Sequence, residues 1–208
     1  MARQAEFAMH TRSCLLLAAL IGGSASLSAQ LRVQVGGGVT ASTMLVTDSI
    51  LEPIRVRPAL APTLMVSLDG ALDSVYRVGI SVTVGSSMLR SHTPTATTDI
   101  VSLTVWQPAV RLGRYWGPLD VGLRAGLQVY RASRPVGIFR DGGKVTPTVG
   151  ADLALRGPRI VGAQFGMAAD WTLSRFNTTT LSLSGFSGEQ TVQRVALRVT
   201  IAGGPGAH

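Results

Sequence analysis

Residues 76–85 read YRVGISVTVG: the even-numbered residues are apolar and the odd-numbered residues between them are polar or glycine. Successive side chains of a β-strand point to opposite faces of a sheet, so a period of two predicts a strand with one apolar and one polar face. The same alternation returns from Leu31 almost to the C-terminus, with no convincing helical pattern between the segments. The sequence therefore predicts an all-β protein.

Eight segments carry this two-residue period. They are residues 31–41, 59–68, 76–89, 99–113, 119–131, 145–156, 159–174 and 190–202. Most exceed the roughly 9–11 residues with which a tilted strand crosses a bilayer. We expect residues 30–208 to form a single eight-stranded antiparallel up-and-down transmembrane β-barrel.

The composition favours a membrane barrel over a soluble protein. Hydrophobic residues make up 46% of the 208 residues, mean hydropathy is +0.31, and charged residues reach only 14%, against about 25% in ordinary soluble domains. No stretch approaches the ~20 apolar residues of a transmembrane helix. A membrane barrel combines these features because its apolar residues alternate with residues that face the lumen.

The N-terminal segment has the charged, apolar and small-residue order of a secretory signal peptide. Its apolar run, Cys14–Ile21, follows two arginines and is eight residues long, too short to span a bilayer. We predict a signal peptide at residues 1–29, with cleavage after Ala29 or, as a second candidate, after Ala25; Met9 is an alternative start. A buried N-terminal helix is the other interpretation. Cleavage removes the only cysteine of the chain, so no disulfide framework is expected.

The predicted connections alternate between long and short. The long ones are 42–58, 90–98, 132–144 and 175–189, and the short ones are 69–75, 114–118 and 157–158. The short ones contain the turn dipeptides Asp69-Gly70, Gly117-Pro118 and Gly157-Pro158. Outer-membrane barrels have tight periplasmic turns at one end and extended loops at the other. An even strand count then places both termini in the periplasm.

The polar face of the strands predicts the content of the lumen, since a membrane barrel turns its apolar side chains to lipid. An eight-stranded barrel is just wide enough for side chains to fill it, which favours a packed polar plug over an open pore. The expected lumen residues are Arg32, Gln34, Thr63, Ser67, Arg77, Ser81, Thr83, Arg111, Arg124, Gln128, Asp152, Arg156, Gln164, Asp170, Arg194 and Arg198. Buried charges need partners, and Asp152 and Asp170 are the expected anchors for the arginines.

Two segments depart from the simple pattern. In residues 99–113 the apolar positions are odd up to Val105 and even from Val110 onward, which predicts a β-bulge near Gln107-Pro108 or, alternatively, two short strands meeting at a loop. The first long connection is unusually apolar, with Met44-Leu45-Val46. Either the neighbouring strands extend beyond the membrane, or this loop folds over the barrel mouth.

In strand count, loop asymmetry and alternation, residues 31–202 resemble the small eight-stranded outer-membrane barrels of the OmpA/OmpX/OmpW type. The resemblance implies a location in the cell outer membrane, contact with outer-membrane lipid, and insertion by the barrel insertion machinery. Such barrels usually end in a strand whose last residue is aromatic, whereas here the last strand ends near Ile201. No motif specific to one member is present, so the resemblance assigns no functional residue.

Candidate catalytic groups are few. His92 lies beside Ser91, with Asp99 seven residues on, nominally a base, a nucleophile and an orienting acid. Adjacent residues of a short loop seldom point at one another, so a solvated loop histidine is the favoured interpretation. The predicted mature chain has two histidines and no cysteine, which excludes a closed zinc site. Gly36-Gly37-Gly38 lacks the Lys-Ser/Thr and helix of a phosphate loop. We expect no catalytic, cofactor or metal site.

The formal charge of +8 raises the possibility of nucleic-acid binding, but the arginines are scattered singly through the strands, so no nucleic-acid partner is expected. The leading hypothesis is a non-enzymatic outer-membrane barrel with a structural or surface-interaction role, whose extracellular partner the sequence does not identify. One alternative is a soluble exported lipocalin-like barrel that binds a small apolar ligand inside. A lipid-modifying outer-membrane enzyme is the other.

Overall fold

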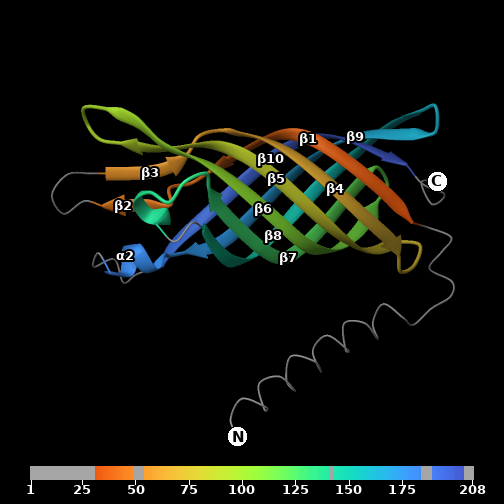
Figure 1. The fold of residues 1–208 in the computed structure, drawn as a ribbon. Helices are drawn as coiled ribbons and strands as arrows, with labels where there is room; N and C mark the ends of the chain where they lie inside the picture. Colours follow the sequence, from red (N-terminus) through yellow and green to blue (C-terminus); the bar gives the residue numbers. More distant parts are fainter. Residues whose placement is uncertain (1–30, 49–53, 141–142, 184–188, 204–208) are drawn as a thin grey trace, which may run out of the picture.

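The computed structural model describes residues 31–48, 54–140, 143–183 and 189–203 (Figure 1), and the predicted signal peptide lies outside them. Eight long strands form the wall: β1 Arg32–Ser42, β4 Ala61–Ala71, β5 Tyr76–His92, β6 Thr97–Trp116, β7 Leu119–Ala132, β8 Gly143–Ile160, β9 Ala163–Phe176 and β10 Gln190–Gly203. Each overlaps one of the eight predicted segments, so the predicted strand count of the barrel is confirmed.

The eight strands close into a ring of antiparallel pairs in the order β5-β4-β1-β10-β9-β8-β7-β6, and β6 pairs again with β5. The first and last strands are hydrogen-bonded to each other, with Val35 opposite Ile201. Closure leaves the wall without a free edge, which is a condition for a sheet to exist in lipid. Figure 1 shows the tilted strands wrapping around a common axis.

The outer surface of the wall is apolar and the inner surface is polar. Ile80 and Leu123 are 60% and 67% exposed on the outside, whereas Arg77 and Arg124 point inward and are each 7% exposed. This is the arrangement of a barrel whose solvent is lipid. A soluble lipocalin-like barrel needs the opposite arrangement, with its apolar face inside, so that alternative is wrong.

β6 is one continuous strand, and the predicted bulge at Gln107-Pro108 is wrong. These residues pair with Thr83 and Val82 in a register that continues unbroken as far as the pair Leu89 and Val101. From Val101 to Tyr115 the odd-numbered side chains face inward, and the inner surface itself changes from polar to apolar at Val105. The apolar residues switch from odd to even positions because the lining of the lumen differs on the two sides of Val105, not because a residue is inserted.

Of the predicted turn dipeptides, only Gly117-Pro118 forms a turn, with Gly117 at φ 58°. Asp69-Gly70 lies inside β4, and the chain reverses at 72–75 instead. Gly157-Pro158 lies inside β8 at a shift in register, and the β8–β9 turn is Val161-Gly162. A bulge tolerates a proline that has no N–H to donate, so the dipeptide Gly-Pro did not mark the end of the strand.

The two ends of the barrel differ. We call the end with the turns 72–75, Gly117-Pro118 and Val161-Gly162 the turn end; β1 begins there and β10 ends there. In the first of these turns Asp73 Oδ1 accepts hydrogen bonds from the backbone N–H groups of Tyr76 and Val75, both 2.6 Å long. These bonds hold the pKa of the Asp73 carboxyl below its usual value.

The opposite end, the loop end, carries the long connections. They contain β2 Val46–Asp48, β3 Ile54–Pro58, the short helix η2 Gly137–Phe139 and the short helix α2 Thr179–Leu183. Within the described residues, no helix has the length and apolarity that crossing a membrane requires.

A sheet extends from the barrel at the loop end. β3 pairs with the last residues of β5, β2 pairs with β3, and β6 continues beside β5 beyond its last pair with β7. We call this four-stranded sheet, β2-β3-β5-β6, the protruding sheet (Figure 1, left side). Two explanations were suggested for the apolar sequence of the first loop, strands that extend further and a loop that folds over the barrel mouth. Both hold, because the strands beside the loop extend beyond the ring and Leu45 of the loop is fully buried.

Candidate functional site

The middle of the lumen is filled by a network of buried ion pairs. On the side of β6, Arg111 Nη2 lies 2.6 Å from Asp120 Oδ1 and 2.7 Å from Asp152 Oδ2. Arg111 Nε also donates to both carboxylate oxygens of Asp152. One guanidinium thus joins carboxylates from β7 and β8.

The network continues across the lumen to β9 and β10. Arg124 Nη1 lies 2.6 Å from Asp170 Oδ1, and its Nε lies 3.4 Å from Asp152 Oδ1. Arg198 donates to the other oxygen of Asp170. Asp152 and Asp170 each bind two arginines, which confirms the sequence-based expectation that these two carboxylates are the anchors.

The residues expected to line the lumen do so, but the expected set lacks two buried carboxylates, Asp120 of β7 and Asp69 of β4. Asp69 is buried on the inner face of β4 and lies near Arg32, Arg77 and Arg111. The dipeptide Asp69-Gly70 had suggested a turn, which hid its place in the strand. The sequence does contain a signal that Asp69 faces the lumen. Ser67 was expected there, and Asp69 lies two residues further along the same strand, so the two residues share a face.

Glycines make room for the network. Gly113 of β6 and Gly122 of β7 form an inward-facing cross-strand pair. A Cβ atom at Gly122 would lie 2.7 Å from Arg111 Nε, so the absence of side chains at this pair provides the space that the guanidinium occupies. The cavity beside the network, lined by Gln34, Ser67 and the acidic residues among others, is about 20 Å³, room for about one water molecule.

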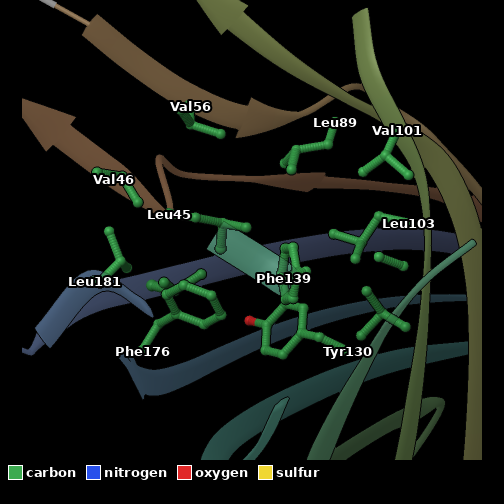
Figure 2. Close-up of a cluster of buried hydrophobic side chains, with 13 residues drawn as sticks. Leu45, Val46, Val56, Leu89, Val101, Leu103, Tyr130, Phe139, Phe176 and Leu181 are labelled. Carbon is green, nitrogen blue, oxygen red and sulfur yellow. The ribbon is translucent and has the colours of Figure 1, made fainter. Parts of the chain in front are cut away.

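A second, apolar layer closes the lumen at the loop end. We call it the loop-end cluster (Figure 2); it consists of Leu45, Val46, Val56, Leu89, Val101, Leu103, Val105, Tyr130, Ala132, Phe139, Phe176, Leu181 and Val192. Its residues come from the wall, from the first loop, and from both short helices. The centre is aromatic, with the Tyr130 and Phe176 rings edge to face at 5.1 Å and the Phe139 and Phe176 rings at 5.8 Å.

Polar side chains connect the cluster to the lumen below it. Gln128 Oε1 accepts hydrogen bonds from the Tyr130 hydroxyl, 2.9 Å, and from Ser174 Oγ, 2.8 Å. The buried tyrosine therefore presents its ring to the apolar layer and its hydroxyl to the polar layer. Two packed layers in series fill the lumen of the described barrel.

The candidate catalytic residues are not brought together. His92 Nδ1 lies 2.9 Å from Thr97 Oγ1, and its Nε2 accepts a hydrogen bond from Arg57 Nε. Asp99 forms an exposed ion pair with Arg90, 2.8 Å. Ser91 precedes His92 on a strand, so the two side chains leave opposite faces. Gly36-Gly37-Gly38 lies in the middle of β1 rather than in a loop before a helix.

The outer face of the protruding sheet is basic. Arg57 of β3 lies directly opposite Arg90 of β5, and Arg55 lies opposite His92. The three arginines are exposed, while Val56 and Leu89 on the other face of the same strands are buried in the loop-end cluster. Like charges in directly opposite positions destabilise a sheet, so this face is unusual for a purely structural extension.

No protein-family profile matches the chain, and no curated protein resembles it in sequence. Solved structures do resemble its fold. Outer membrane protein AlkL, determined in lipid bilayers, superposes with a TM-score of 0.54 at 11% identity over 87% of this chain and 92% of its own. Neisserial surface protein A gives 0.50 at 13% identity, over 83% and 95%. OprG from Pseudomonas aeruginosa gives 0.50 at 12% identity, over 85% and 94%.

These similarities concern the fold, and the physical character of the wall is consistent with them. Apolar residues face outward around the whole ring, the ring has no open edge, and the ion-pair network lies inside. A barrel built in this way is stable in lipid, and barrels of this class occupy outer membranes. The chain therefore has the fold of the small eight-stranded barrels of the cell outer membrane.

Proposed function

We propose that this protein is a non-catalytic outer-membrane barrel that holds a basic recognition surface, the protruding sheet, at the cell surface, where it binds a negatively charged partner. The observation that carries the proposal is the row formed by Arg55, Arg57 and Arg90 on the exposed face of that sheet, where the pair Arg90–Asp99 balances only one of the three positive charges. The planar guanidinium group of arginine can donate two parallel hydrogen bonds to a carboxylate, sulfate or phosphate group on such a partner.

The inside of the barrel supports a role for its surface. The ion-pair network and the loop-end cluster fill the lumen, which argues against transport through it. His92 bonds to Arg57 and Asp99 to Arg90, and Ser91 leaves the strand on the face opposite to His92, which argues against a catalytic triad. In this proposal the barrel is an anchor, and its contacts with outer-membrane lipid and the insertion machinery serve to place the sheet.

The edges of the protruding sheet add a second means of contact. Among the described strands, β2 has a neighbour on one side only, and residues 97–99 of β6 pair only with β5. Unpaired strand edges present backbone N–H and C=O groups that an extended partner segment can bond. Charge would guide a partner to the sheet and backbone pairing would hold it.

The test is binding of a polyanion to the barrel in lipid nanodiscs, with dextran sulfate as the probe. Reversing the charge of Arg55, Arg57 and Arg90 to glutamate is expected to weaken binding by more than about tenfold, since like-charge contacts cost several kcal/mol. The matched control reverses three exposed loop-end arginines outside the sheet, Arg134, Arg140 and Arg175.

The control variant is expected to bind like the wild type, and wild-type binding is expected to weaken with salt. Equal losses in both triple variants would reduce the effect to net charge and refute a specific surface. So would a wild-type protein that does not bind the probe at low salt.

A further inference from the structure

The turn end of the lumen gathers three guanidinium groups around one aromatic ring. Arg156 places its guanidinium carbon 3.2 Å from the centroid of the Tyr115 ring, and Arg77 places its own at 5.2 Å. Arg32 Nη1 donates to the Tyr115 hydroxyl, 3.1 Å. The residues come from β1, β5, β6 and β8, so four strands of the wall position the group.

Positive charge is in excess at this place. In the middle of the lumen Arg111, Arg124 and Arg198 are matched by Asp120, Asp152 and Asp170. Toward the turn end, the buried carboxylates Asp69 and Asp120 both attract Arg32 and Arg77, but both carboxylates also interact with Arg111. Arg156 has the charges of Arg32 and Arg77 as its neighbours.

Hydrogen-bond donors at this place are also unused. Nε of Arg32 and Nε of Arg156 are buried, and neither has a hydrogen-bond partner among the described residues. Arg32 as a whole is only 6% exposed. A buried charged donor without an acceptor is costly, and a group that supplies both negative charge and acceptor oxygens would relieve both deficits together.

We propose that Arg32, Arg77, Arg156 and Tyr115 form a binding site for a phosphate group at the turn end of the lumen. Arginine forks match the oxygens of phosphate, and the stacking of Arg156 on the Tyr115 ring holds one fork in a fixed plane. Arg156 and Tyr115 are only half-buried, so the site is reached from the turn end. It lies at the opposite end from the protruding sheet and does not depend on the proposed function.

The test is the midpoint of urea unfolding in neutral detergent, measured as phosphate replaces chloride at constant ionic strength. Phosphate is expected to raise the midpoint of the wild type, because a ligand that binds only the folded state stabilises it. Arg156→Gln is expected to lose this shift, corresponding to about tenfold weaker binding or more. The matched control is Arg159→Gln, which removes an exposed arginine three residues further along β8.

Arg159→Gln is expected to respond to phosphate like the wild type. No shift in the wild type, or the same shift in Arg156→Gln as in Arg159→Gln, would overturn the proposal. Tyr115→Phe is a second variant that keeps the ring and removes the hydroxyl that holds Arg32; it is expected to bind phosphate more weakly. An unchanged phosphate response in Tyr115→Phe would contradict the role of the Tyr115 hydroxyl in holding Arg32 at the site.

Two lipid conditions separate free phosphate from a lipid head group. Phosphate stabilisation in vesicles of digalactosyl diacylglycerol, a lipid without phosphate, assigns the site to a soluble phosphate. If added phosphatidylglycerol stabilises the barrel instead, the site is assigned to a lipid phosphate. This result requires that Arg156→Gln abolishes the stabilisation and that free phosphate competes with the lipid. Absence of both effects would contradict the proposal, whatever the detergent measurement gives.

Discussion

Arg111 of β6 and Asp152 of β8 bond over the strand that separates them, with Arg111 Nε 3.1 and 2.8 Å from the two carboxylate oxygens. The strands themselves do not pair with each other, because β7 lies between them. The side chains thus link second neighbours of the wall, which backbone hydrogen bonds cannot do. Lumen ion pairs of this kind brace the barrel across its axis.

Breaking this brace is expected to destabilise the barrel strongly. Arg111→Ala leaves Asp120 buried without its arginine, and the loss of one partner of a buried pair costs about 3–5 kcal/mol. Urea unfolding in detergent measures the loss. Arg90→Ala is the control, because the Arg90–Asp99 side chains are 45% and 49% exposed and such pairs contribute only about 0–1 kcal/mol. Similar losses in the two variants would contradict the bracing role.

A charge on the outer wall tests the lipid assignment. Leu123 is 67% exposed in the middle of β7, and Leu123→Arg is expected to cost about 2–4 kcal/mol at the bilayer midplane. Refolding into lipid vesicles measures this. Leu183→Arg changes a still more exposed leucine of α2 outside the barrel wall and is expected to be nearly neutral. Normal folding of Leu123→Arg in lipid would refute the lipid-facing assignment.

Two packed layers predict that the barrel conducts poorly. Ionic conductance in planar bilayers is expected to be small or absent, and the double variant Phe139→Ala with Phe176→Ala is expected to stay closed because the ion-pair network remains. Any leak is expected to favour anions, given the excess of lumen arginine over aspartate. Large, stable single-channel steps in the wild type would show that the two layers do not close the lumen.

The β8–β9 turn offers a stabilising substitution. Val161 is 100% exposed and has φ 49°, followed by Gly162 at φ 80°. A β-branched residue is strained in this region, whereas asparagine tolerates it in a two-residue hairpin turn. Val161→Asn is expected to raise the free energy of unfolding by about 1 kcal/mol. Val161→Thr keeps the branch and adds polarity; an equal gain there would rule out the backbone explanation.

Protease added to intact cells tests the orientation. If the loop end is extracellular, trypsin is expected to cut after Arg140, which is exposed beside η2, and to spare Arg159 near the turn end. Lys144 lies on the same side but is paired with Tyr130 in the sheet, so it is expected to resist cleavage. Cleavage at Arg159 with Arg140 protected would invert the topology.

The alternation predicted the wall and the lumen well because it reports directly which residues share a face. It identified Leu123 as outward and Arg124 as inward from sequence alone. It failed at Val105, where the change in parity predicted that the strand turns its other face inward. The same face stays inward, and the inner environment changes from polar to apolar. That change depends on Phe139 and Phe176, which reach the same layer from distant parts of the chain. No local pattern contains this information.

The turn-end group was equally hidden. Each of its arginines was expected in the lumen. Their position around Tyr115 depends on the register of four strands relative to one another, and the alternation of polar and apolar residues does not specify register. Asp69 was lost for a related reason: a dipeptide typical of turns outweighed its position in a strand. Local turn preferences are weaker than the pairing of a closed sheet.

The pairing of β1 with β10 also determines when the barrel can form. Val35 meets Ile201, so the seam joins segments far apart in the sequence, and it cannot form before β10 is present. Until the last strand arrives, β1 and β9 each have an exposed edge beside an apolar outer face, the combination most prone to aggregation. Contacts so distant in sequence form slowly. Closure is therefore a late event in the life of the chain, and it removes the last exposed strand edges of the ring.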